Sequence, residues 1–249
     1  MGSRGPGRTI GPCRTLDVIP RSRQQLLTLI AIALTFGSGA NDVASFTRLG
    51  GVFTSVMTGN IVFFGLAVAD RSVSLASHTA VSVAGYIAGV AVATWVSYGV
   101  RTRSSAAGGR VLPGHVRWAL FAELVLLAGG AVGWEVTGAR PRGGTEFALL
   151  AVAAAAMGMQ SAAVSEMGFR NFSTTFLTGT LTWLVSSVVR PGEDSSDWPR
   201  RVSALIALAA GACLSGFLVA NAARAVPVLA LAGVGTGLAL SVRAAREDD

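Results

Sequence analysis

The chain contains no lysine, and all 20 of its basic residues are arginine. It therefore cannot form a lysine Schiff base with a substrate or with retinal, and it lacks the lysine of a phosphate-binding P-loop. Histidine and cysteine are nearly as scarce, with two of each, and there is no CxxC or His/Cys cluster that would predict a zinc site. Cys13 and Cys213 have no reason to meet, so we expect no disulfide. No cofactor is predicted.

Charged residues are also few, at 13% against about 25% in a typical soluble domain. They are absent from long runs at residues 26–40, 52–69, 72–100, 202–223 and 225–242. About 20 apolar residues are enough to cross the hydrocarbon core of a bilayer. The sequence therefore predicts an all-α, polytopic integral membrane helix bundle whose main partner is the lipid bilayer.

The net charge of +7 does not indicate a nucleic-acid partner. The arginines lie in short loops and tails beside apolar runs, where membrane topology places them, and no soluble basic domain is left over. We expect a multi-pass protein of the inner (plasma) membrane with a cytoplasmic N-terminus. The oligomeric state stays open, a homo-oligomer included.

The chain divides into four parts. Residues 1–22, rich in Gly, Arg and Pro, predict a disordered cytoplasmic tail. A first membrane repeat is expected at 23–142, a second at 143–243, and a short tail at 244–249. The start of the chain could imitate a cleaved signal peptide, but the corresponding segment of the second half is internal, which favours a structural role for both.

Eight apolar segments can be counted, at 24–46, 52–69, 74–100, 117–138, 146–166, 172–189, 202–223 and 226–242. The positive-inside rule favours six crossings over eight, with one full crossing in each of the stretches 24–69 and 146–189 and the remainder re-entrant. Three crossings per repeat would make the two halves inverted relative to each other. Eight crossings, with parallel halves, remain the alternative.

One motif occurs twice. Residues 54–60 read Thr-Ser-Val-Met-Thr-Gly-Asn, and residues 174–180 read Thr-Thr-Phe-Leu-Thr-Gly-Thr. We expect Thr54 and Thr58 to share a helix face, with a matching threonine stripe in the second copy, and Gly59 and Gly179 to permit a break in each helix. Paired polar breaks are how many carriers place a solute site between two halves. The alternative is ordinary hydrogen bonding between helices.

Further polar residues fall inside apolar segments. Asp42 is predicted either to bind a solute or a proton beside Asn41, or to pair with Arg48 near the interface. Gln160 and Ser161 are expected at the positions equivalent to Ala40 and Asn41. The predicted solute-binding set is Asn41, Asp42, Thr54, Thr58, Gly59, Asn60, Gln160, Thr174, Thr178 and Gly179.

Other chemistry-bearing residues receive structural interpretations. Glu123 is the other candidate for a buried acid, although its place near the segment start favours reaching the interface or pairing with Arg117. His78 and His115 are expected at the surface, without a metal. The five tryptophans mostly fall near segment ends, as interfacial anchors do.

The motifs resemble the signature of the YoaK-like family of small bacterial membrane proteins. The similarity lies in residues 39–46 (Gly-Ala-Asn-Asp-Val-Ala-Ser-Phe), 51–53, 57–60, 158–163 and 174–180, and it extends over about residues 24–242. The resemblance implies a six-crossing topology but no substrate. In that pattern Gly or Tyr more often stands at the position of Asn41, so a role for Asn41 is not implied by the resemblance.

Three functions follow as hypotheses. The first is a small-solute transporter or channel, for a polar or ionic solute bound between the repeats. The second is a membrane scaffold that does not transport. The third is an intramembrane enzyme, because residues 36–39 (Phe-Gly-Ser-Gly) approach the GxSG of rhomboid-like proteases. Since Phe36 replaces the first glycine and no histidine lies mid-helix to act as a base for Ser38, no enzyme is predicted.

Overall fold

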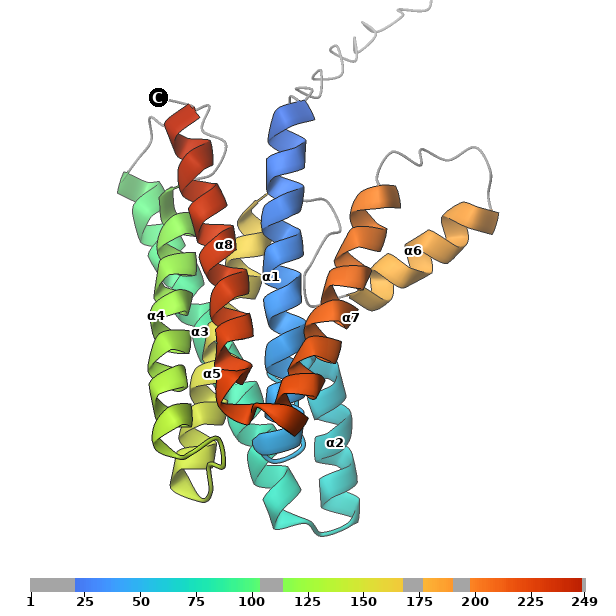
Figure 1. The fold of residues 1–249 in the computed structure, drawn as a ribbon, viewed down its shortest axis with the longest axis vertical. Helices are drawn as coiled ribbons and strands as arrows, with labels where there is room; N and C mark the ends of the chain where they lie inside the picture. The colour runs from blue at the N-terminus through green and yellow to red at the C-terminus, as the bar shows by residue number, and fades with distance from the viewer. Residues whose placement is uncertain (1–20, 104–113, 168–176, 190–197, 248–249) are drawn as a thin grey trace, which may run out of the picture.

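The computed structural model describes residues 21–103, 114–167, 177–189 and 198–247 (Figure 1). Throughout these residues the chain forms helices and short turns, without a strand, which confirms the predicted all-α class. In chain order the elements are α1 (Arg21–Arg48), α2 (Met57–Ala69), α3 (Val73–Arg103), α4 (Gly114–Val136), α5 (Gly144–Glu166), α6 (Leu177–Val189), α7 (Trp198–Asn221), the short 3-10 helix η1 (Ala223–Ala225) and α8 (Val226–Glu247).

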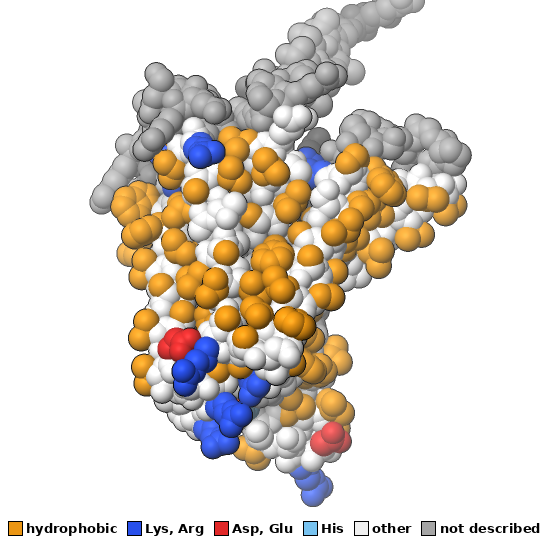
Figure 2. Space-filling view, in the orientation of Figure 1, with side chains coloured by type: hydrophobic (Ala, Val, Ile, Leu, Met, Phe, Trp, Pro, Cys, Tyr) orange, Lys and Arg blue, Asp and Glu red, His pale blue; other side chains and the backbone are white. Residues whose placement is uncertain are grey.

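Six of these helices are long and apolar enough to cross a membrane, as predicted. The other two, α2 and α6, have 13 residues each and are too short to cross a bilayer core alone. Large apolar side chains cover the outer faces of the bundle over its middle (Figure 2), where they contact lipid. Trp95, Phe121 and Val132 are among the most exposed of them.

The helices define two ends of the molecule (Figure 1). We call the end at which α1 begins and α8 finishes the upper end, and the opposite end, with the α4–α5 and α7–α8 connections, the lower end. The short helix α2 lies at the lower end and the short helix α6 lies at the upper end. The lengths therefore follow the order long, short, long, long twice along the chain, and corresponding helices run in opposite directions.

Glycines bring two pairs of helices into close contact. A Cβ atom at Gly39 of α1 would clash with the carbonyl oxygen of Leu208 in α7, and one at Gly211 would clash with that of Phe36. The α3–α5 pair repeats this arrangement, with Gly89 against Ala155 and Gly158 against Tyr86. The pairs of small residues four apart at Gly85/Gly89 and Gly211/Ser215 thus lie at helix contacts, and the Ser215 hydroxyl donates to Ala40 O at 2.8 Å.

The interior lies between α1, α4, α5 and α8, where α1 packs against α8, α4 packs against α5, and α4 meets α8. Its upper half is a dense apolar cluster that includes Ile30, Leu34, Leu120, Met157 and Val234. A separate, smaller cluster around Leu49, Val52, Trp134, Leu150 and Val226 fills the lower end.

Candidate functional site

A turn at residues 49–56 joins α1 to α2, and Asp42 organises it. Asp42 Oδ1 accepts hydrogen bonds from the Thr54 amide at 2.8 Å, the Thr54 hydroxyl at 2.9 Å and the Ser55 amide at 2.8 Å, while Oδ2 accepts from the Ser55 hydroxyl. The carboxylate is 6% exposed. The predicted alternative pairing with Arg48 is not formed, because that guanidinium donates to Val219 O instead, at 3.1 Å.

Asn60 holds the same turn from the other side. Its Oδ1 accepts from the Phe53 amide at 2.9 Å, and its Nδ2 donates to Phe53 O at 2.7 Å and to the Ser82 hydroxyl of α3 at 3.0 Å. The Ser45 hydroxyl donates to Val52 O at 2.9 Å. Together these side chains form hydrogen bonds with backbone groups that have no partner within a helix. A turn buried inside a membrane protein requires such partners.

The break in the first half therefore precedes the Thr-Gly step. Thr54 is buried in the turn, whereas Thr58 and Gly59 lie in the first turn of α2 and Thr58 is exposed. The prediction that Thr54 and Thr58 share a helix face is wrong, because Thr54 is not helical. Of the first-half candidates, the structure brings together Asn41, Asp42, Thr54 and Asn60, and Asn41 Nδ2 donates to the Thr54 hydroxyl at 3.1 Å.

The second-half motif lies elsewhere. Thr178 and Gly179 are exposed on α6, which makes its main described contacts with α7 at the upper end, and the Thr182 hydroxyl donates to Thr178 O. Thr174 falls outside the described residues. The described residues of the two motifs thus lie at opposite ends of the bundle. They do not form one site, as had been expected.

Gln160 is fully buried and links the two halves. Its Nε2 donates to the hydroxyl of Ser38 in α1 at 2.7 Å, and the Ser38 hydroxyl donates to Leu34 O at 3.2 Å. Its Oε1 finds no donor within the described part of the chain. Gln160 and Asn41 each lie two residues beyond a glycine at a close helix contact, Gly158 and Gly39.

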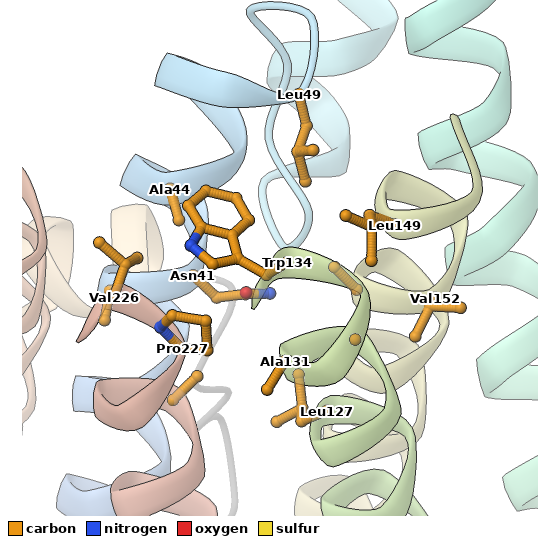
Figure 3. A pocket seen from close by; sticks show the side chains of 14 residues that line it. Asn41, Ala44, Leu49, Leu127, Ala131, Trp134, Leu149, Val152, Val226 and Pro227 are labelled. Carbon is orange, nitrogen blue, oxygen red and sulfur yellow. The ribbon is translucent and has the colours of Figure 1, made fainter. Parts of the chain in front are cut away.

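A pocket of about 50 Å³ lies between α1, α4, α5 and α8, next to the dense upper cluster, with which it shares Leu127 and Ala230. Figure 3 shows the side chains that line it. This volume is enough for a few water molecules or part of a small solute. Asn41 and Trp134 face into it, and most of the remaining wall is aliphatic or alanine, as at Ala44, Leu127 and Ala153. Trp134 Nε1 already donates to Ala223 O at 2.8 Å. Asn41 Oδ1, by contrast, accepts from no described residue, so it is the open polar group of the wall.

Comparison with known proteins agrees with this architecture. A model of the family described as protein of unknown function (DUF1275) matches residues 30–241, from within α1 to within α8. The chain belongs to the DUF1275 family. It is also 30% identical over 166 residues to the UPF0700 transmembrane protein YoaK of Bacillus subtilis (strain 168), covering 67% of each chain. No solved structure matches it significantly. The resemblance to the YoaK-like family is thereby confirmed.

Within this DUF1275 fold, Glu123 is a residue whose setting the sequence reasoning missed. It was expected to reach the interface or to pair with Arg117, but it is 0% exposed on the inner face of α4, and neither carboxyl oxygen has a partner among the described residues. Its position between the buried Leu120 and Leu127 was the available signal, because residues three and four apart share a helix face.

The histidines and one tryptophan also differ from expectation. His78 and His115 are buried rather than at the surface, at 6% and 4% exposure. His78 Nε2 lies 3.2 Å from Glu146 and His115 Nε2 lies 3.8 Å from Glu166. Trp134 is 4% exposed in the pocket wall rather than at the interface. In the parts of the chain that the structure describes, no cluster of three metal-ligating side chains occurs.

Proposed function

We propose that this protein is a small-solute carrier, without enzymatic activity, whose binding site is the pocket between α1, α4, α5 and α8. The observation that supports it best is the position of this pocket: two helices of each half form its wall, and the dense upper cluster closes the interior above it, whereas the smaller lower cluster lines it. A site between two halves that dense packing closes toward one end is what a carrier presents in one of its two states.

The proposal includes two inverted repeats, 23–142 and 143–243. The support is the repeated order of helix lengths and the two glycine crossings, α1 with α7 and α5 with α3, which use corresponding positions. Inverted halves can exchange conformations, so that the closed half of one state becomes the open half of the other.

We place the upper end in the cytoplasm and the protein in the plasma membrane. Among helical and turn residues of the structure, arginines at the lower end are Arg48, Arg71, Arg140, Arg142 and Arg224, whereas about twice as many stand at the upper helix ends. The positive-inside rule then assigns the upper end, with both helical termini, to the cytoplasm.

The wall suggests the class of solute. Its surface is mostly apolar, with one amide oxygen, Asn41 Oδ1, that accepts hydrogen bonds. A small molecule with an apolar body and a hydrogen-bond donor fits this wall better than a strongly hydrated ion, because the pocket offers no charge to replace lost hydration.

The test is a substitution that fills the pocket with a larger side chain. Ala131→Phe should place a ring in the wall, whereas Val132→Phe, at the next position of α4, enlarges a side chain that is 64% exposed toward lipid. Flux of a panel of small neutral and amphipathic solutes into proteoliposomes should fall at least about tenfold for Ala131→Phe and stay near wild type for Val132→Phe. No flux of any solute in the wild type would favour the scaffold, which the internally satisfied hydrogen bonds of Asp42 and Asn60 also fit.

A further inference from the structure

The helix contacts define a counterpart for each pocket residue in the other half. A Cβ atom at Gly233 of α8 would clash with the carbonyl oxygen of Ala33 in α1, and one at Gly130 of α4 would be in ordinary contact with the side chain of Val152 in α5. Ala33 and Val152 are also related by the crossing glycines Gly39 and Gly158, so the two contacts involve corresponding positions.

Val226, a wall residue of the pocket, lies two helical turns before Gly233 in α8. Glu123 lies two helical turns before Gly130 in α4. Asn41, the polar wall residue, corresponds to Gln160. The counterpart of the pocket is therefore the part of the dense upper cluster that encloses Glu123 and Gln160.

The same contacts place these two side chains at one level. Gly130 meets Val152 and Gly133 meets Leu149, which sets the register of the antiparallel pair α4 and α5. Two turns farther toward the upper end, Glu123 is level with Met159 and Gln160. Three acceptor oxygens without a described donor, two of Glu123 and Oε1 of Gln160, thus lie in adjacent helices in a dry interior.

An ionised carboxylate in such a place would have to give up its hydration without compensation, at a cost of several kcal/mol or more. The charged and titratable side chains that the structure describes in α4 and in the helices that pack on it do not neutralise it. In α5 they are Glu146 and Glu166, which lie beside His78 and His115 near the helix ends. The others stand at or near helix ends or are tyrosines: Arg243 in α8, Tyr86 and Tyr98 in α3, and Arg117 and Glu135 in α4 itself.

We infer that Glu123, at the level of Gln160 in the neighbouring helix, is a proton-binding site in the closed half of the carrier. In the closed state the carboxyl group holds its proton. When this half opens, water reaches Glu123, the O–H bond breaks, and the proton passes to water. A proton fits better than a metal cation, because three side-chain oxygens in an interior whose helical carbonyls are already paired are too few to replace a hydration shell. The inference rests on the proposed function.

Two measurements test it on the full-length protein, purified and reconstituted in lipid. The first is infrared spectroscopy at neutral pH, with Glu123→Gln as the isosteric neutral variant and Glu135→Gln, an exposed acid of the same helix, as the matched control. We expect the carbonyl stretch of a protonated carboxyl group in the wild type and in Glu135→Gln, and its loss in Glu123→Gln. A wild-type spectrum without that band would overturn the assignment.

The second measurement follows opening of the closed half. In a background of Cys13→Ser and Cys213→Ser, Ala163→Cys places a thiol in the upper cluster. A maleimide reacts with the thiolate, so the labelling rate is divided at each pH by that of Val132→Cys, an exposed thiol in the same background. This ratio should rise with pH, by at most about tenfold per pH unit for one proton, and Glu123→Gln should abolish the rise. A ratio that does not change with pH in the presence of Glu123 would overturn the proton site but not the carrier. If the infrared band is present but the thiol is not labelled at any pH, the closed half does not open. That result would overturn the proposed carrier and with it the release of the proton.

Discussion

At the scale of single residues, the polar side chains of the first half build a turn. Asp42 and Asn60 together bind the backbone at Phe53, Thr54 and Ser55, so their hydrogen-bonding capacity is largely used inside the protein. Asn41 differs from both, because its side-chain amide nitrogen donates to Thr54 while its amide oxygen is open to the pocket. Substitutions at Asp42 and Asn60 are therefore tests of stability before they are tests of transport.

The role of Asn60 in holding the turn predicts the outcome of a pair of substitutions in α2. Asn60→Leu removes the partner of the Phe53 amide and carbonyl and of Ser82, and should lower the free energy of unfolding by about 2–4 kcal/mol. Thr58→Val changes an exposed side chain and should stay within about 0.5 kcal/mol of wild type. Denaturation of the purified protein in detergent measures both. Equal stability of the two variants would show that the turn does not depend on Asn60.

Single-residue settings were the part of the site that the sequence predicted least well. That Asn41, Asp42, Thr54 and Asn60 form one polar set could be predicted, because all four are polar residues in apolar surroundings. The burial of Glu123 was indicated only by its spacing from Leu120 and Leu127, and how complete it is depends on which helices cover α4. The position of the break could not either, because Val52, Phe53 and Val56 continue the apolar run and only tertiary hydrogen bonds hold them in a turn.

At the scale of helices, apolar runs were enough to predict the eight segments, with boundaries close to those observed, and arginine placement was enough to favour six crossings. This worked because a bilayer requires long uncharged helices and so leaves a direct record in the sequence. The partners of the helix faces that carry the glycines left no such record. Which helix each face meets depends on the three-dimensional arrangement, as in the pairing of α1 with α7 and α5 with α3.

The two crossings should be equally sensitive to added volume. Gly89→Ala and Gly211→Ala each place a Cβ against a backbone carbonyl oxygen, and we expect each to destabilise the protein by about 1–3 kcal/mol. Gly65→Ala in α2, where nothing lies within 4 Å of the added atom, should be neutral or slightly stabilising, since alanine favours helices. Thermal denaturation in one detergent compares the three. Tolerance at one crossing together with loss at the other would contradict their equivalence.

At the scale of the whole molecule, the interior is asymmetric although its helices repeat. The lower half holds a pocket with Asn41 in its wall, and the corresponding upper half is packed around Glu123 and Gln160. If the halves are inverted repeats, each can adopt the conformation of the other at little cost in packing, and the closed region would open as the pocket closes. The proposed solute site and the inferred proton site are then corresponding locations in the two halves.

The most direct test of this account compares two alanines at corresponding positions, Ala44 in the pocket wall and Ala163 in the upper cluster. Each is replaced by cysteine in the background without native cysteines, and a maleimide that cannot cross the membrane is applied from one side at a time. The account predicts that Ala44→Cys reacts only from the side of the lower end and Ala163→Cys only from the side of the upper end. Reaction of both from one side, or an Ala163→Cys thiol inert from either side, would contradict alternating access.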